Sequence, residues 1–172
     1  MPYLIEGDYK LTEADAIVRY IVSRSNKKEL MGKNPKDEGK INQLMSVMID
    51  IHKIMGSMFM AQTSEEKKLE NQAKIEAKLQ QIDDCYGEKP FALGYLTLAD
   101  FNNSESSFYL EKMFPNIYNK YGFLKRVREA VENLPEIKKY YEQESAIKGP
   151  LFVLPNEPIV KSWLIRYIGK WI

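Results

Sequence analysis

Apolar residues recur at steps of three and four over most of the chain, a spacing that predicts amphipathic helices. The longest such stretch runs from about Asp37 to Met60 and is rich in methionine. A second begins at a capping box, Thr63-Ser64-Glu65-Glu66, and ends at Gly87, where a C-terminal glycine stop belongs. The apolar positions are Ile41, Leu44, Met48, Ile51, Met55 and Met58 in the first stretch and Ile75, Leu79, Ile82 and Tyr86 in the second. We therefore expect two long helices, each with one buried face.

Shorter helices are predicted towards the C-terminus. Thr97 and Asp100 form a further capping box, which Leu96 and Phe101 flank as a hydrophobic staple would. These two polar residues are therefore expected to start a buried helix. A later helix carries Leu124, Val127, Val131 and Leu134 on one face, and Pro135 begins a short last helix.

The first residues follow a different pattern. Two short β-prone runs, at residues 3–5 and 9–11, flank Glu6-Gly7-Asp8 and predict a β-hairpin. A capping box at Thr12-Glu13-Ala14-Asp15 predicts that a helix follows directly. Its apolar stripe is Ala16, Ile17, Tyr20 and Ile21, and it is expected to end near residues 25–26.

The charge and breaker pattern divides the chain into parts. Residues 27–39 are charged and contain Gly32, Pro35 and Gly39, which is typical of a linker. We therefore expect a front part at residues 1–26, a linker at 27–39 and an all-α part at 40–172 with an apolar tail from about residue 146. The fold class is mainly α, with a small β-containing front.

Composition excludes several functions. A net charge of +1 on 172 residues provides no field that would attract nucleic acid. The one cysteine, Cys85, cannot form an intramolecular disulfide, and the start of the chain has no signal-peptide pattern, so we expect a cytoplasmic protein. Cys85 is expected to be a packed, inert thiol. His52 stands alone in the sequence, so we expect no metal site.

Two segments carry a resemblance to a known family. Residues 2–7 with 10–21 (PYLIEG and KLTEADAIVRYI) resemble the second half of the glutathione-binding domain of cytosolic glutathione S-transferases, closest to the mu class. Residues 94–101 (GYLTLADF) are similar to the capping box and staple of the buried helix in that family's all-helical domain. The resemblance covers roughly residues 1–145. It implies a truncated thioredoxin-like remnant, lacking the first strand–helix–strand, before the all-helical C-terminal domain.

The resemblance also implies an activity and a binding site. The family conjugates the thiol of glutathione, its co-substrate, to hydrophobic electrophiles, and uses no other cofactor. Pro2 matches the family's cis-proline, and the backbone of Met1 would meet the cysteinyl amide of glutathione. Glu13 and Ala14 match the acidic-or-amide plus serine pair that binds the γ-glutamyl end. Ala14 lacks that serine's hydroxyl, a loss worth about 1.5–3 kcal/mol for a hydrogen bond to a charged group.

Several alternatives stay open at this stage. The family's catalytic hydroxyl has no counterpart here, so no catalytic residue is assigned and we expect weak or no activity from these 172 residues. Met55, Met58 and Phe59 either line the electrophile pocket or pack in the core. The alternative function is a non-catalytic interaction or binding module of glutathione S-transferase type.

The tail and the oligomeric state are open as well. The apolar, basic segment Trp163–Ile172 docks onto the bundle, binds a partner or contacts a membrane surface; docking is the expectation, and membrane contact the least expected of the three. The resemblance implies a homodimer for a complete family member and leaves the state of this chain undecided.

Overall fold

The computed structural model describes residues 2–60 and 64–143, except for the side chains of residues 59 and 60. Two strands and seven α-helices occur in this part. They are β1 (Tyr3–Glu6), β2 (Tyr9–Thr12), α1 (Ala14–Arg24), α2 (Pro35–Met60), α3 (Glu65–Tyr86), α4 (Leu98–Met113), α5 (Pro115–Lys120), α6 (Gly122–Glu132) and α7 (Pro135–Tyr141), with a 3-10 turn, η1 (Lys28–Met31), between α1 and α2. The expected mainly α fold with a small front hairpin is confirmed.

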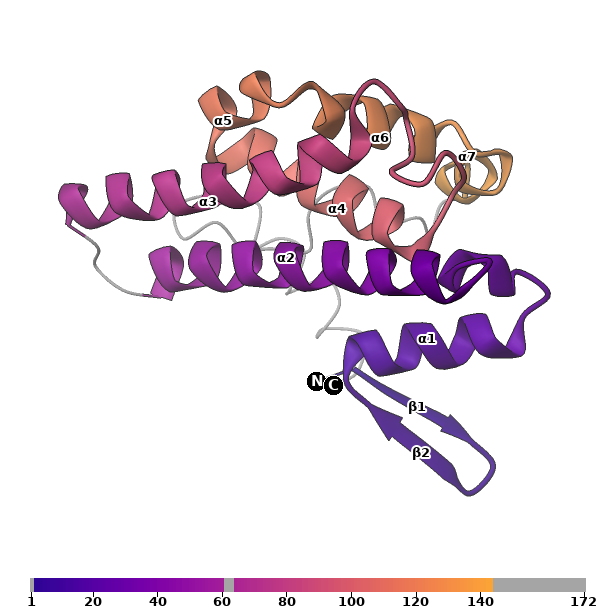
Figure 1. Ribbon diagram of the computed structural model, residues 1–172. Helices are drawn as coiled ribbons and strands as arrows, with labels where there is room; N and C mark the ends of the chain where they lie inside the picture. Colours follow the sequence, from indigo (N-terminus) through magenta and orange to yellow (C-terminus); the bar gives the residue numbers. More distant parts are fainter. Residues whose placement is uncertain (1, 61–63, 144–172) are drawn as a thin grey trace.

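The helix α2 lies between the front of the chain and the other helices (Figure 1). On one side it packs against α3 and α4; on the other lies α1, with the hairpin beyond it. The two predicted apolar stripes meet in the core: Ile41, Met48, Ile51, Ile75, Leu79, Ile82 and Tyr86 are fully buried. The last helices complete this core through Phe123, Leu124, Val127 and Val131 of α6.

The predicted capping box before α4 is present and buried. The Asp100 carboxylate accepts hydrogen bonds from the Thr97 backbone N–H (2.7 Å) and the Thr97 hydroxyl (2.8 Å). It also accepts from the Tyr86 hydroxyl (2.7 Å) and the Ala92 N–H (3.1 Å). The start of α4 is thereby joined to the end of α3 and to the loop between these two helices.

The other two capping boxes differ from the prediction. Thr12 pairs with Tyr3 in the hairpin, so it is a strand residue and cannot cap α1; Glu13 occupies the cap position instead. At α3 the cap is Ser64, whose hydroxyl accepts from the Lys67 N–H (3.3 Å), while Thr63 lies outside the described residues.

Two expected helix limits and one buried face are also corrected. α2 begins at Pro35 rather than near Asp37, because the Asn34 side chain accepts the N–H groups of the next turn. Consequently, Gly39 lies inside this helix and not in an irregular linker. Ile21 is 52% exposed, and Val22 is the buried residue of α1. Leu134 follows α6 as the cap of α7, and the short helix α5 was not predicted.

Candidate functional site

The front unit, which we define as β1, β2 and α1, presents the predicted glutathione-binding residues. The two antiparallel strands pair Tyr3 with Thr12 and Glu6 with Tyr9. The Tyr20 hydroxyl and the Arg24 guanidinium of α1 both donate to the Glu6 carboxylate, and these two donors lower its pKa. These side-chain hydrogen bonds therefore link the hairpin to α1.

Glu13 lies at that turn in an unusual backbone conformation. Its φ of 70° and ψ of 120° make it the one non-glycine residue with positive φ in the described part of the chain. Such a conformation costs on the order of 1–3 kcal/mol and is often found at binding sites. Glu13 is exposed, and its carboxylate makes no capping hydrogen bond to α1. The chain thus maintains a strained residue whose side chain does not stabilise the helix that it precedes.

Ala14 is the first residue of α1 and is exposed. The first N–H groups of an α-helix have no partner within the helix and carry partial positive charge, which favours an anion. Next to them, the Glu13 carboxylate favours a cation. A ligand with an ammonium and a carboxylate on one carbon, as at the γ-glutamyl end of glutathione, suits this pair of groups.

The remaining residues predicted for the site are less completely described. Pro2 is exposed, but Met1 lies outside the described residues, so the cis bond between them stays a prediction. Met55 is buried in the core and Met58 is half-buried against it. The backbone of Phe59 belongs to α2, while its side chain lies outside the described part. Their role as a pocket wall stays a prediction, and so does the docking of the tail, which falls outside the described residues.

The single histidine makes a contact between helices. The Ser106 hydroxyl on α4 donates to the Asn102 carbonyl (2.7 Å), so its oxygen is left to accept from His52 Nε2 on α2 (2.8 Å). Burial lowers the pKa of His52, against the opposing effect of Glu105. Within the described residues, no cluster of three or more His, Cys, Asp or Glu side chains could hold a metal ion.

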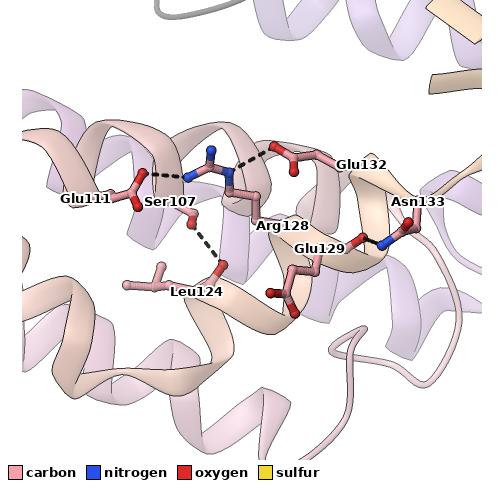
Figure 2. Close-up of polar contacts among 7 residues, drawn as sticks. All are labelled: Ser107, Glu111, Leu124, Arg128, Glu129, Glu132 and Asn133. Carbon is pink, nitrogen blue, oxygen red and sulfur yellow. Dashed lines mark hydrogen bonds and ion pairs between the residues drawn. The ribbon is translucent and has the colours of Figure 1, made fainter. Parts of the chain in front are cut away.

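A second cluster of polar side chains joins α4 to α6 (Figure 2). Arg128 donates to Glu111 (2.8 Å) and Glu132 (2.9 Å), and the Ser107 hydroxyl donates to the Leu124 carbonyl (2.8 Å). Each of these donors has an acceptor in the bundle. This cluster accordingly stabilises the packing of the two helices and is not a candidate for chemistry.

Sequence reasoning missed one polar cluster at the start of α2. There the Tyr95 hydroxyl donates to the Asp37 carboxylate (2.6 Å) and accepts from the Lys33 N–H (3.2 Å). The pair Asn34-Pro35, an N-cap residue followed by proline at the first helical position, is the signal that could have indicated it. In the described part of the chain, no helix has the length and apolar character that crossing a membrane requires.

The chain is similar to glutathione S-transferases in sequence and in fold. A family model described as the glutathione S-transferase C-terminal domain matches residues 49–144. The class-mu 26 kDa glutathione S-transferase of Schistosoma mansoni is 30% identical over 154 residues, which are 88% of this chain and 68% of that protein. The corresponding Schistosoma japonicum isozyme is 28% identical over 152 residues, with the same coverage.

A solved structure supports the same relation at the level of the fold. The glutathione S-transferase of Methylobacterium radiotolerans, crystallised with glutathione sulfonate, has a TM-score of 0.70 at 17% identity. The match covers 91% of this chain and 76% of that one. The resemblance inferred from the sequence is thus confirmed: the chain belongs to the glutathione S-transferase family.

Proposed function

We propose that the chain binds glutathione through the front unit and belongs to an enzyme that conjugates the glutathione thiol to hydrophobic electrophiles. The observation that supports this most is Glu13, a strained and exposed acidic residue at the start of α1, in the position that the family uses for the γ-glutamyl end. Backbone strain that no local contact explains is best accounted for by a ligand that needs it.

In this proposal each group has a defined part. The Glu13 carboxylate receives the γ-glutamyl ammonium, and the N–H groups at the start of α1, including that of Ala14, receive the γ-glutamyl carboxylate. The Met1 backbone and Pro2 hold the cysteinyl part. Met55, Met58 and Phe59 of α2 contribute to the electrophile pocket. Glutathione is the co-substrate, and we place the protein in the cytoplasm.

We also propose that residues 1–26 form a glutathione-binding part and that a linker joins it to the helical part, which begins inside the segment predicted as linker, at Pro35 of α2. None of the matched site residues supplies a hydroxyl to activate the thiol. We therefore expect these 172 residues by themselves to bind glutathione weakly and to show little conjugation. Family members usually dimerise, and we assign no oligomeric state to these 172 residues.

The test is retention on immobilised glutathione with a matched pair of variants. E13A removes the side-chain oxygens proposed to meet the ammonium, whereas E65A makes the same change at the exposed first residue of α3. We expect E13A to weaken retention by about tenfold, the effect of losing a hydrogen bond to a charged group, and E65A to leave it unchanged. Equal retention of the two variants would contradict the proposed site.

A non-catalytic binding module is the second candidate, and Ala14 favours it, because the expected serine hydroxyl is absent. Conjugation of glutathione to 1-chloro-2,4-dinitrobenzene separates the two functions. Turnover that E13A reduces indicates the enzyme, and retention that E13A weakens without any detectable turnover indicates the module.

A further inference from the structure

The front unit places one buried side chain, Val22 of α1, in the core of the molecule. Among the side-chain hydrogen bonds of the described residues, one links α1 to α2, from Arg19 Nη2 to the Met45 sulfur (3.5 Å). So few contacts leave the orientation of the front unit to be determined mainly by the segment that follows it, residues 25–37, which we call the joint.

Tyr95 contacts the joint from a distant part of the chain. It belongs to the loop between α3 and α4, far along the chain, and its hydroxyl is bonded to both the Asp37 carboxylate (2.6 Å) and the Lys33 N–H (3.2 Å). The Lys33 ammonium also lies over the Tyr95 ring, 3.9 Å from its centroid, as in a cation–π contact. One side chain therefore contacts the joint in three ways.

The loop that carries Tyr95 is itself fixed to the core. The Ala92 N–H donates to the buried Asp100 carboxylate (3.1 Å), and Lys89 Nζ donates to the Ala92 carbonyl (2.8 Å). Because Asp100 also caps α4, the position of Tyr95 follows that of the helical bundle. A tyrosine on a mobile loop could not transmit such a constraint.

The part of the joint that precedes α2, residues 25–34, is also closely packed against the first turn of this helix. Gly32 has a φ of 117°, and a Cβ atom there would lie 2.7 Å from the Glu38 backbone nitrogen. The Asn34 amide donates to the Asp37 carboxylate (3.0 Å), next to the Tyr95 hydroxyl on the same oxygen. Rotation of the joint would break these contacts together.

We propose that Tyr95 is a positioning residue, which fixes the front unit relative to α2 by holding the joint. Its effect on binding rests on the proposed function, in which Glu13 and Ala14 lie on the front unit and the electrophile residues lie on α2. The distance between the thiol and the electrophile then depends on the joint. The restraint of the front unit itself does not depend on that function.

The experiment compares Y95F with Y121F in the full chain. Both changes delete a tyrosine hydroxyl that makes a long-range hydrogen bond, but the Tyr121 hydroxyl donates to the Glu76 carbonyl within the bundle (3.0 Å). Amide hydrogen exchange is followed by mass spectrometry over residues 14–37 and over α3. We expect Y95F to accelerate exchange in residues 14–37 by about tenfold, because the opening free energy falls by one hydrogen bond to a charged group, and Y121F to leave that segment unchanged.

A second comparison tests the partner of the hydroxyl. D37N retains the size of the side chain but weakens the bonds that Asp37 accepts from Tyr95 and Asn34, so it should accelerate the same exchange. Adding Y95F to D37N should then have a smaller effect than Y95F alone, because the two residues share the Tyr95–Asp37 bond. Unchanged exchange in Y95F, or equal acceleration in Y121F, would overturn the proposal.

Glutathione affinity separates this inference from the proposed function. A several-fold weaker affinity in Y95F, without loss of thermal stability relative to Y121F, supports both. Faster exchange in Y95F while no variant binds glutathione supports the positioning role of Tyr95 and contradicts the proposed function instead.

Discussion

Asp100 is fully buried at the start of α4, and its carboxylate accepts hydrogen bonds from Tyr86, Ala92 and Thr97. Burial raises the pKa of Asp100, and these donors act in the opposite direction. The cost of burying the carboxylate is thus offset by a complete set of partners. Such a network stabilises the fold only while every member is present.

We therefore predict that D100A lowers the free energy of unfolding by about 3–5 kcal/mol, because each buried donor left without an acceptor costs on the order of 1 kcal/mol or more. T97V, which removes one donor from the same network, is expected to cost only about 1 kcal/mol. Urea denaturation of both variants at neutral pH measures the difference. A loss in D100A no larger than that in T97V would show that the network contributes little.

His52 makes the stability of the fold depend on pH. Its pKa is lowered from 6.5 in the fold by burial, so the unfolded chain takes up a proton before the native chain does. The stability due to neutral His52 is therefore fully present above about pH 6.5 and is lost as the pH falls below that value. The sequence has no second histidine to mask the effect.

The expected result is a decline in the free energy of unfolding from pH 7 to pH 5.5 that is much smaller in H52Q. Glutamine can still donate to Ser106 but does not take up a proton. Denaturation curves at four or five pH values measure both slopes. An identical slope in the two proteins would mean that His52 is not the group responsible.

At the scale of elements, the long periodic helices could be predicted and the short or cap-dependent features could not. Ile75, Leu79, Ile82 and Tyr86 repeat over three turns, and all are buried as expected. In contrast, α5 has six residues, too few to display a period. Thr12 has the residue type of a cap, but strand pairing with Tyr3 takes precedence, and only the structure shows that pairing.

The same limit applies to the candidate site. The resemblance indicates Glu13 and Ala14, but no sequence pattern reveals that Glu13 has a positive φ, since glutamate rarely adopts one. Similarly, Tyr95 and Asp37 lie far apart in sequence, and their contact depends on how the α3–α4 loop folds over the joint. Long-range contacts of loops are set by the whole fold.

The strain at Glu13 leads to a prediction at this scale. E13G should stabilise the front unit by about 1 kcal/mol, because the strain that glycine avoids, about 1–3 kcal/mol, exceeds the roughly 0.5–1 kcal/mol of extra chain entropy that glycine loses on folding, and Glu13 makes no capping bond that would be lost. The same change should weaken glutathione binding. Hydrogen exchange of α1 and retention on immobilised glutathione measure the two effects.

The control is E13A, which loses the carboxylate but keeps the strain, so it should weaken binding without stabilising α1. If E13G instead destabilised α1, Glu13 would contribute contacts to the fold, and its backbone strain would no longer support a role in ligand binding.

At the scale of the whole molecule, the chain combines a helical bundle with a small front unit that has few contacts to it. The bundle has a continuous core from α2 to α6. The front unit instead exposes large apolar side chains, among them Tyr3, Ile5 and Ile21. The proposed function requires that this exposed front unit binds glutathione.

Backbone amide chemical shifts of the labelled chain, titrated with glutathione and in parallel with cysteinylglycine, answer it most directly, even for millimolar affinity. We predict that glutathione shifts the amides of Glu13, Ala14 and Asp15, and that the dipeptide, which lacks the γ-glutamyl end, does not. Unmoved amides at these residues, or equal shifts with both ligands, would contradict it.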